Sequence, residues 1–264
     1  MERGIVMLRE GGLRVRIETH RQYSERDVDF FAWVVAQVPW RGGERVLDVG
    51  CGNGAYLPYY AAHTRDIVAM DISAEMLAAA RKRGVPGVRF LQGDATALPF
   101  PAGTFDLLFA NHVLFFVRDI DRALEEARRV LRPGGLFVAT TNTEDSQQAL
   151  YALHARALHR VGRIARPLPH ARFSLQNGAE RVKALFGQVE VRRHQNAFLF
   201  PDVNAAMRYY LSGPINEVVG PPLNAEERRL VIEEVRDRIA RIIERDGVWR
   251  VPKDAGVLLA RKEG

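Results

Sequence analysis

The first half of the chain alternates between short apolar runs and longer amphipathic segments. The apolar runs are typical of buried strands, and they lie at residues 45–49, 67–70, 88–92, 105–110 and 136–140. Most of the segments between them carry apolar side chains at helical spacing, at residues 55–63, 74–83 and 119–131. This succession of strand, helix and strand predicts a parallel sheet with right-handed crossover connections.

The sequence also predicts how two helices begin. Ser73 is expected to be the N-cap of the helix over residues 74–83, because its hydroxyl can accept from an unpaired backbone amide of the first turn. Farther along, Asn177 is expected to cap a helix over residues 178–186, with Glu180 completing a capping box.

The N-terminal region is mixed in pattern. Val6–Leu8 and Leu13–Ile17 alternate weakly around two glycines, which suits a small hairpin. Residues 28–38 carry apolar and aromatic side chains at helical spacing, and Pro39 is expected to end that helix.

The second half of the chain is less regular. Helices are predicted over residues 144–161, 202–211 and 224–245, and strands over residues 189–200 and 256–262. The last of these helices is expected to pack through one apolar face, which consists of Val231, Val235, Ile239 and Ile242.

The stretch Glu44–Tyr56 carries the strongest chemical signal. It runs from a predicted strand into Gly50, Gly52 and Gly54, which let the backbone turn sharply and approach a ligand closely. The helix that follows would present unpaired amide groups and the positive end of its dipole. A glycine loop by itself also fits an ordinary tight turn, so the neighbouring residues decide its meaning.

Polar side chains mark the ends of the next predicted strands. Asp48 lies inside the apolar run before the glycine loop, where a carboxylate needs a cationic or hydrogen-bonding partner. Asp71 ends the next run, at a position from which a carboxylate can hold both hydroxyls of a ribose. Asp94 follows the third run, and Asn111 and His112 follow the fourth. Since the carboxyl ends of parallel strands meet at one edge of a sheet, we expect a ligand crevice there.

These motifs resemble the class I S-adenosylmethionine-dependent methyltransferases, most closely the type 11 group, which is similar to the ubiquinone and menaquinone C-methyltransferases. The matching motifs follow the order and spacing of that family, at Val46–Gly54, Asp71–Ser73, Gly93–Phe100, Phe105–Leu108 and Leu131–Leu136. The resemblance implies an α/β fold: a Rossmann-like, seven-stranded, mostly parallel sheet with an antiparallel C-terminal hairpin strand and helices on both faces. It also implies an N-terminal and an inserted helical cap.

The resemblance further implies how the chain is divided. Residues 1–40 are predicted to form an N-terminal segment that covers the active site. Residues 41–264 are predicted to form the methyltransferase domain, with residues 143–175 and 201–246 as helices on the acceptor side.

The cofactor that the resemblance implies is S-adenosyl-L-methionine. Its ammonium and sulfonium cations suit Asp48, and Asp71 is expected to hold the ribose hydroxyls. Asp94 is expected to accept a hydrogen bond from the adenine amino group. The other residues implied in cofactor binding are Gly50, Gly52, Asn53, Gly54, Ile72, Met76, Ala95, Thr96 and Asn111. No metal is implied.

Methyl transfer is an in-line displacement, so the protein mainly supplies orientation and a dry site. A base is needed only if the attacking atom must lose a proton. His112 is the leading candidate, since an imidazole titrates near neutrality. His20 and Tyr23 are further candidates, because in related methyltransferases the segment before the glycine loop lies over the cofactor and acceptor.

The absence of three family-specific features narrows the chemical class of the methyl acceptor. Asn111–Phe116 lacks the Asn/Asp-Pro-Pro-aromatic run that amino-methyltransferases of nucleic-acid bases commonly carry. The paired glutamates of protein arginine methyltransferases are also missing. The single cysteine, Cys51, lies in the glycine loop and is interpreted as a packing residue rather than the nucleophile of a cytosine C5 enzyme. A small-molecule acceptor with a nitrogen, oxygen or carbon nucleophile is therefore expected.

Composition and charge leave two alternatives open. The chain has 264 residues, 47% of them hydrophobic, which is ample for a core. A formal charge of +6 and the basic segment Arg160–Arg166 keep an RNA methyltransferase as one alternative. Because the basic residues are interspersed with acidic ones, a nucleic-acid partner is not favoured but is not excluded. A cofactor-binding protein without transfer activity is the other alternative.

The sequence also indicates a location. The N-terminus lacks the apolar core of a signal peptide, and no apolar run approaches the ~18 residues of a membrane span. We expect a cytoplasmic protein with no membrane partner. A monomer and a homodimer both remain open.

Overall fold

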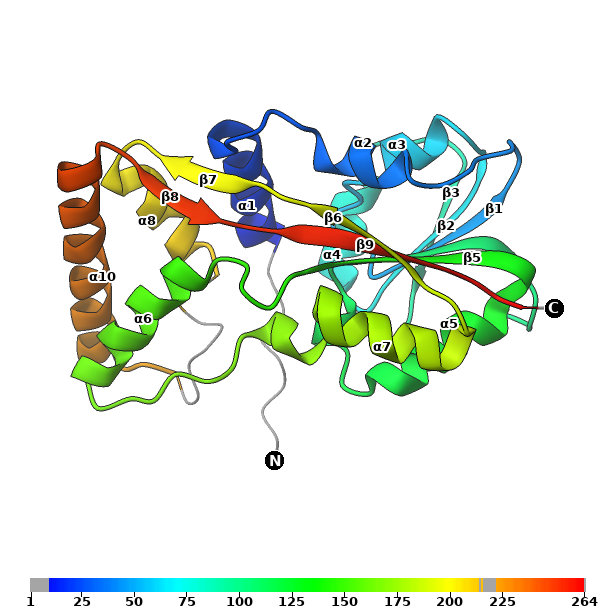
Figure 1. Cartoon of the computed structure of the whole chain (residues 1–264). Coiled ribbons are helices and arrows are strands. Elements are labelled where there is room, and N and C mark those ends of the chain that lie inside the picture. The colour runs from blue at the N-terminus through cyan, green and yellow to red at the C-terminus, as the bar shows by residue number, and fades with distance from the viewer. Residues whose placement is uncertain (1–9, 214, 216–221, 264) are drawn as a thin grey trace. The chain divides into compact units, whose positions relative to one another are not determined.

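The computed structural model describes residues 10–213, 215 and 222–263, and its ribbon is drawn in Figure 1. The described residues form two compact units, each assembled from segments far apart in the sequence. The sheet unit consists of residues 28–144, 172–193 and 255–263. The second unit consists of the described parts of residues 1–27, 145–171 and 194–254.

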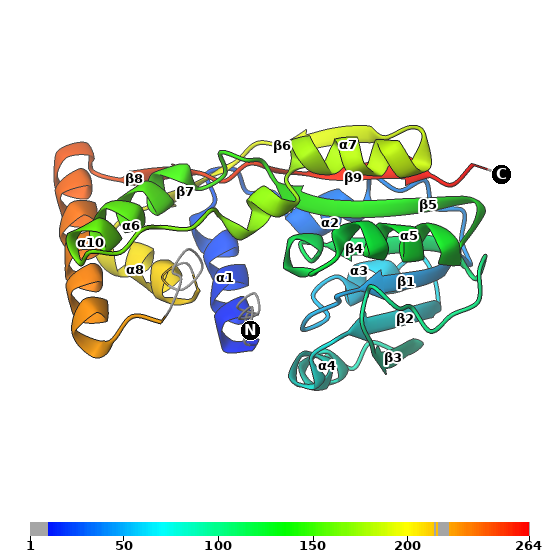
Figure 2. The same ribbon diagram turned by 90° about the horizontal axis from the view of Figure 1, so that it is seen from below.

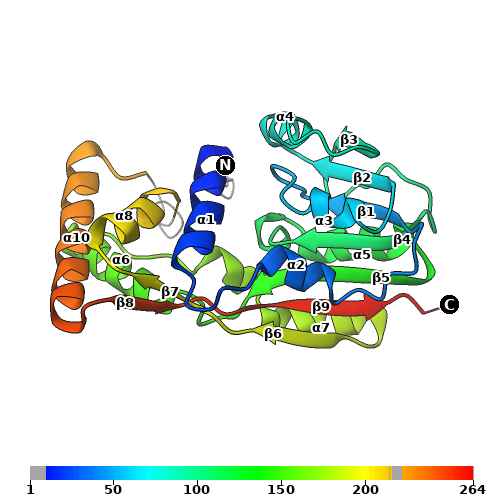
Figure 3. The same ribbon diagram turned by 90° about the horizontal axis from the view of Figure 1, so that it is seen from above.

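The sheet unit is built on a seven-stranded sheet whose order is β3-β2-β1-β4-β5-β9-β6, as Figure 3 shows. The strands are β1 Arg45–Val49, β2 Asp66–Asp71, β3 Val88–Gln92, β4 Phe105–Asn111, β5 Leu131–Asn142, β6 Glu190–His194 and β9 Ala255–Arg261. β1 to β5 pair in parallel, whereas β9 runs antiparallel to β5. The predicted mostly parallel, Rossmann-like sheet with an antiparallel C-terminal strand is confirmed.

Helices cover both faces of this sheet. They are α2 Phe30–Val35, α3 Leu57–Ala61, α4 Ala74–Arg81, η1 Leu114–Phe116, α5 Ile120–Val130 and α7 Leu175–Phe186. The short helix η2 Pro169–Arg172 lies where the chain passes from the second unit into the sheet unit. In Figure 1, α2 and α3 lie above the sheet and α5 and α7 below it, and Figure 2 shows the latter pair in front of the strands.

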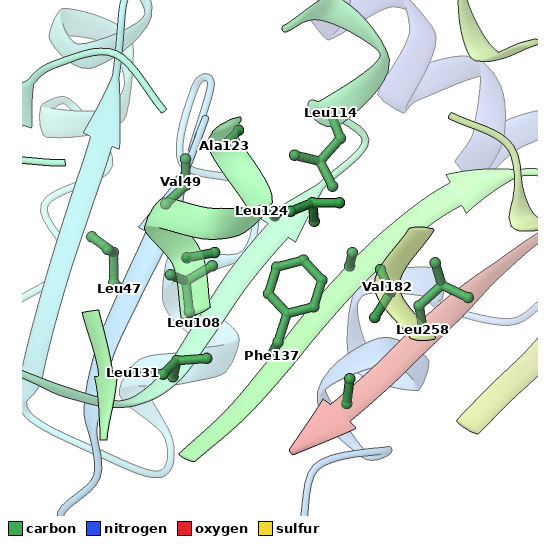
Figure 4. Packing of buried hydrophobic residues seen from close by; sticks show 14 of the residues in the cluster. Leu47, Val49, Leu108, Leu114, Ala123, Leu124, Leu131, Phe137, Val182 and Leu258 are labelled. Atoms are coloured by element: carbon green, nitrogen blue, oxygen red, sulfur yellow. The ribbon is translucent and has the colours of Figure 1, made fainter. Parts of the chain in front are cut away.

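The two faces are buried by alternate residues of the same strands. Leu108 and Phe137 pack with Leu124 of α5 and Val182 of α7 in one cluster (Figure 4). Their neighbours in sequence, such as Phe109 and Val138, pack in a second cluster with α2, α3 and α4. Strands that are buried on both sides read as continuous apolar runs. The strand pattern in the sequence therefore arises because helices cover both faces.

Of the two predicted N-caps, one is confirmed and the other is wrong. Ser73 is the N-cap of α4, and its hydroxyl accepts from the amide of Met76. The predicted capping role of Asn177 is wrong, because α7 begins one turn earlier, with Ser174 as its N-cap. Asn177 is instead the partner in that capping box, and its side chain accepts from the amide of Ser174 at 2.9 Å.

The second unit is mainly helical. Its elements are α1 Glu10–Tyr23, α6 Gln148–Arg160, α8 Val203–Leu211, α10 Ala225–Asp246 and a two-stranded antiparallel sheet of β7 Ala197–Phe200 and β8 Trp249–Pro252. The predicted face of α10 is confirmed, since Val231, Val235 and Ile239 are fully buried in the core of this unit. Asn224 caps that helix in a capping box with Glu227.

The predicted N-terminal hairpin is wrong. Leu13–Ile17 lies inside α1, while Val6–Leu8 falls outside the described residues. Contacts made within the second unit favour the helix: Glu18 pairs with Arg208 at 2.5 Å, and the Arg16 guanidinium lies 5.7 Å from the Tyr209 ring. Tertiary contacts of this kind override weak local alternation.

The predicted strand over residues 189–200 is also wrong as a single element, because it is divided into β6 and β7. The division falls at Asn196, which is buried. Its side-chain oxygen accepts from the amides of Arg26 and Ala197, while its own amide donates to Asp254. These bonds replace the ladder bonds of a continuous strand. The predicted helix over residues 28–38 is likewise shorter, and α2 covers only Phe30–Val35, with Asp29 as its N-cap.

Among the described residues, no helix is both long and apolar enough to cross a lipid bilayer.

Candidate functional site

The glycine loop joins β1 to α3 at the carboxyl edge of the sheet. Gly50, Gly52 and Gly54 all have φ between 55° and 73°, the left-handed region that favours glycine. A Cβ on Gly50 would lie 2.2 Å from Cγ2 of Val113, so that position also has no room for a side chain. The loop is tied to β2, because the amides of Gly50 and Cys51 both donate to the carbonyl oxygen of Met70.

Cys51 lies with its side chain buried in the core under this loop, as a packing residue does.

Asp71 organises the loop from the end of β2. One carboxylate oxygen accepts from the amide of Gly52 at 2.8 Å, and the other accepts from the amide of Ser73 at 2.8 Å. The side chain is 8% exposed. Each oxygen can accept a further hydrogen bond, so this carboxylate can hold the loop and a ligand together.

Asp48 is the most unusual group of the site. It is 1% exposed, and within residues 10–213, 215 and 222–263 no donor forms a hydrogen bond to either of its carboxylate oxygens. Burial, and to a smaller extent the nearby charge of Asp71, raises the pKa of Asp48 to about 8. A buried carboxylate without a partner is costly, so this position suits a cationic ligand.

Within the glycine loop, Asn53 forms hydrogen bonds with the side chain of Arg83. Arg83 donates from Nε to the carbonyl oxygen of Asn53 at 2.5 Å and from Nη2 to its side-chain oxygen at 3.3 Å. The predicted site residue Asn53 is therefore held by Arg83, which follows the C-cap of α4. Sequence reasoning missed Arg83, because a basic residue at the end of a predicted helix is usually exposed to solvent.

Asp94 follows β3, which lies beside β2 with Gln92 opposite Asp71. Asp94 is exposed, and one of its oxygens accepts from both the amide and the hydroxyl of Thr96 at 2.9 Å. The side-chain amide of Gln92 donates to the carbonyl oxygen of Ile72 at 3.0 Å. Sequence reasoning missed Gln92, which ties the ends of β2 and β3 together.

The predicted residues around these strand ends differ in exposure. Ile72 is 51% exposed, whereas Met76 is 6% exposed in the first turn of α4. Ala95 and Thr96 are half-buried. An exposed apolar side chain such as Ile72 at the edge of a loop can cover one face of a flat ligand.

Asn111 ends β4 beside β5, and His112 follows it. The Asn111 side chain donates to the hydroxyl of Tyr60 at 2.7 Å and accepts from the hydroxyl of Thr140 at 3.2 Å. Tyr60 lies in α3 and was missed by sequence reasoning, because its position at helical spacing predicts only a core residue. The Asn111 amide is thus fixed between two elements.

His112 has a left-handed backbone, with φ of 48°. Its amide donates to the carbonyl oxygen of Thr140 at 3.0 Å, and its ring centroid lies 5.7 Å from that of Phe30. Non-glycine residues in this conformation carry strain and are concentrated at functional sites.

His20 and Tyr23 belong to α1 of the second unit. The His20 ring lies 4.7 Å from the ring of Phe198, and Nδ1 of His20 is 2.9 Å from Nζ of Lys253. The Tyr23 ring lies 5.8 Å from that of Phe200. Their roles toward an acceptor stay predictions.

Comparison with known proteins shows which family the chain resembles. The family described as methyltransferase domain matches residues 47–139, from β1 through most of β5. The chain is 30% identical to a malonyl-(acyl-carrier protein) O-methyltransferase of Pseudescherichia vulneris over 195 residues, which cover 72% of this chain and 71% of that protein. It is 43% identical to a demethylmenaquinone methyltransferase of Renibacterium salmoninarum over 96 residues, covering 36% and 40% of the two chains.

A solved structure supports the same fold. The YcgJ protein of Bacillus subtilis superposes with a TM-score of 0.61 at 19% identity, over 89% of this chain and 98% of that one. Against three further curated relatives with the malonyl-(acyl-carrier protein) name, the chain spans only 50% to 66% of their length.

Proposed function

Because the chain belongs to the class I S-adenosylmethionine-dependent methyltransferases of type 11, we propose that it transfers a methyl group from S-adenosyl-L-methionine to a small-molecule acceptor. The observation that carries this proposal is Asp48, a buried carboxylate to which no described residue donates a hydrogen bond. The ammonium and sulfonium groups of the cofactor are the kind of charge that this carboxylate needs. The residues present therefore fit the cofactor.

The proposed cofactor site follows the strand ends. Asp71 would accept from the ribose hydroxyls while it holds the amides of Gly52 and Ser73. Ile72 and Met76 would flank the adenine, and Asp94 would accept from its amino group beside Ala95 and Thr96. The remaining contacts, to the methionine portion, would come from Gly50, Gly52, Asn53, Gly54 and Asn111.

When bound, the cofactor supplies a methyl group already activated by its sulfonium for in-line displacement. The chain's part is orientation, which can contribute about 7–11 kcal/mol to lowering the barrier. Where the acceptor must lose a proton, His112 is proposed as the base, and Tyr23 and His20 remain proposed for the acceptor side. Nitrogen, oxygen and carbon acceptors are all compatible with this chemistry.

The affinity for S-adenosylhomocysteine is expected to rise with pH up to about 8, the raised pKa of Asp48. Below that pH the carboxyl is protonated, so a ligand ammonium must displace a proton to form the ion pair. The affinity should fall by up to about tenfold for each pH unit below 8. Isothermal titration calorimetry between pH 6 and 8.5 measures this slope.

The matched control is Asp48→Asn, which keeps the shape of the side chain and removes the titrating group. This variant should bind more weakly at pH 8 and lose most of the slope. An equal slope in both proteins would mean that another group causes the pH dependence.

Replacement of His112 separates chemistry from binding. His112→Asn is preferred to His112→Ala, because asparagine tolerates the positive φ at this position better than alanine. Loss of a general base typically lowers turnover by about 10²–10⁴-fold, while the affinity for S-adenosylhomocysteine should change little. A variant with unchanged turnover on the true acceptor would remove His112 from the mechanism.

A panel of acceptors tests the proposed function itself. Formation of S-adenosylhomocysteine would be measured with a malonyl thioester of acyl-carrier protein, with demethylmenaquinone and with an RNA oligonucleotide. The first two follow from the names of relatives that the chain resembles. Turnover with either supports a small-molecule enzyme. Turnover with the RNA alone, or cofactor binding without turnover on any acceptor of a wider metabolite panel, would contradict the proposal.

A further inference from the structure

The second unit contains a buried lysine that is not among the residues proposed for cofactor binding. Lys253 follows β8 and is 7% exposed. Its ammonium nitrogen lies 2.9 Å from Nδ1 of His20, 2.5 Å from the hydroxyl oxygen of Ser24 and 4.4 Å from the centroid of the Phe198 ring. Among the described residues, no carboxylate forms an ion pair with it.

The three neighbours match the three hydrogens of an ammonium group. The Ser24 hydroxyl donates its own hydrogen to the carbonyl oxygen of His20, so it can only accept from Lys253. The face of the Phe198 ring attracts a cation rather than a neutral amine. The third hydrogen then points to Nδ1 of His20, which must carry no proton. The contacts of Lys253 are therefore those of the charged form.

Burial and neighbouring groups also act on Lys253 and on the residues around it. Burial lowers the pKa of Lys253 to about 7, so the ammonium form prevails below that pH. The pKa of His194 is lowered by burial and then by the charges of Lys253 and Arg26, whereas Asp254 acts in the opposite direction. From α8, the Tyr209 ring lies 6.4 Å from that of His20.

We infer that Lys253 is a positioning residue for His20, which it holds as the neutral tautomer with the proton on Nε2. A histidine whose Nδ1 accepts a hydrogen bond must carry its ring proton on the other nitrogen. Lys253 also opposes a second proton on His20, because two cations cannot share this hydrogen bond.

This tautomer changes what His20 can do in the proposed reaction, a consequence that rests on the proposed function. In this tautomer the only ring nitrogen that can accept a proton is Nδ1, and Nδ1 already accepts the hydrogen bond from Lys253. His20 therefore does not act as a general base while Lys253 is charged. Of the candidates in the sequence, His112 and Tyr23 are left for that role.

Long-range proton–nitrogen NMR of the imidazole rings tests the inference on the full chain, without cofactor or acceptor. His20 is assigned by the signals that disappear in His20→Asn. Near pH 6.5 the wild-type spectrum should show His20 with the proton on Nε2. This preference should weaken as the pH rises above about 7, where Lys253 loses its proton. A proton on Nδ1, or an equal mixture of tautomers at pH 6.5, would overturn the inference.

Two variants extend the test. Lys253→Met keeps a long apolar side chain and removes the donor, so His20 should become a mixture of tautomers and should protonate at a pH higher by about one unit. Ser24→Ala is the matched control and should leave the His20 tautomer as in the wild type. An unchanged His20 titration in Lys253→Met would contradict the inference. If that variant does not fold, the wild-type tautomer alone decides. A failed inference leaves the proposed methyl transfer intact, because neither spectrum depends on it.

Discussion

Asp71→Ala is expected to abolish measurable binding of S-adenosylhomocysteine. A charged hydrogen bond to a ligand contributes about 1.5–3 kcal/mol, so the loss of two such bonds to the ribose predicts a decrease of at least about 100-fold in affinity. The same substitution also removes the acceptors of the Gly52 and Ser73 amides, which adds a loss of loop order. Calorimetric titration of the purified variant measures the change.

The matched control lies on the same strand. Asp66 begins β2, and its side chain is 46% exposed where it pairs with Arg89. Asp66→Ala should bind the ligand as the wild type does, since exposed ion pairs contribute little.

A 2′-deoxy analogue of the ligand separates ribose binding from loop distortion. If Asp71 holds the ribose hydroxyls, the wild type should bind the analogue more weakly than the parent ligand, and Asp71→Ala should not distinguish them. Equal discrimination by both proteins would assign the effect of Asp71 to the loop alone.

Gly50→Ala is expected to cause the largest loss of stability of any single methyl addition in the glycine loop. The positive φ costs about 1–2 kcal/mol for a residue with a Cβ, and the overlap with Val113 adds about 1–3 kcal/mol. Gly84→Ala is the control, because Gly84 has φ of 66° but nothing within 4 Å of its added Cβ. Urea denaturation should show a loss of about 2–5 kcal/mol for the first variant and about 1–2 kcal/mol for the second.

The overlap itself can be relieved. Adding Val113→Ala to Gly50→Ala removes the methyl group that the new Cβ meets and should restore part of the lost free energy of unfolding. An equal loss for Gly50→Ala and Gly84→Ala would show that the backbone conformation alone accounts for the effect.

The sheet could be predicted well from the sequence because its signals are local. A strand buried on both faces is a continuous apolar run, and Gly50, Gly52 and Gly54 mark the loop that follows the first of them. The proximity of Asp71 to this loop could also be predicted, since adjacent parallel strands end at the same edge. The hydrogen bond from the Gly52 amide to the Asp71 carboxylate, at 2.8 Å, agrees with that rule.

The second unit could be predicted less well because its contacts are distant in sequence. Leu13–Ile17 alternates weakly, yet it is helical because α1 packs against residues near Tyr209, and no local pattern contains that information. Asn196 divides a predicted strand through bonds to Arg26 and Asp254, which lie 170 and 58 residues away. Lys253 and His20 are likewise separated by 233 residues, so their contact could not be anticipated.

The place of β9 in the sheet has a consequence for biosynthesis. β9 lies between β5 and β6, although it is the last strand in the chain. During translation β6 has no neighbour in the sheet until residues 255–261 have left the ribosome. The edge of β5 stays unpaired for the same interval, and an open strand edge is prone to pair with other chains. Nascent chains truncated before residue 255 should therefore need chaperone protection.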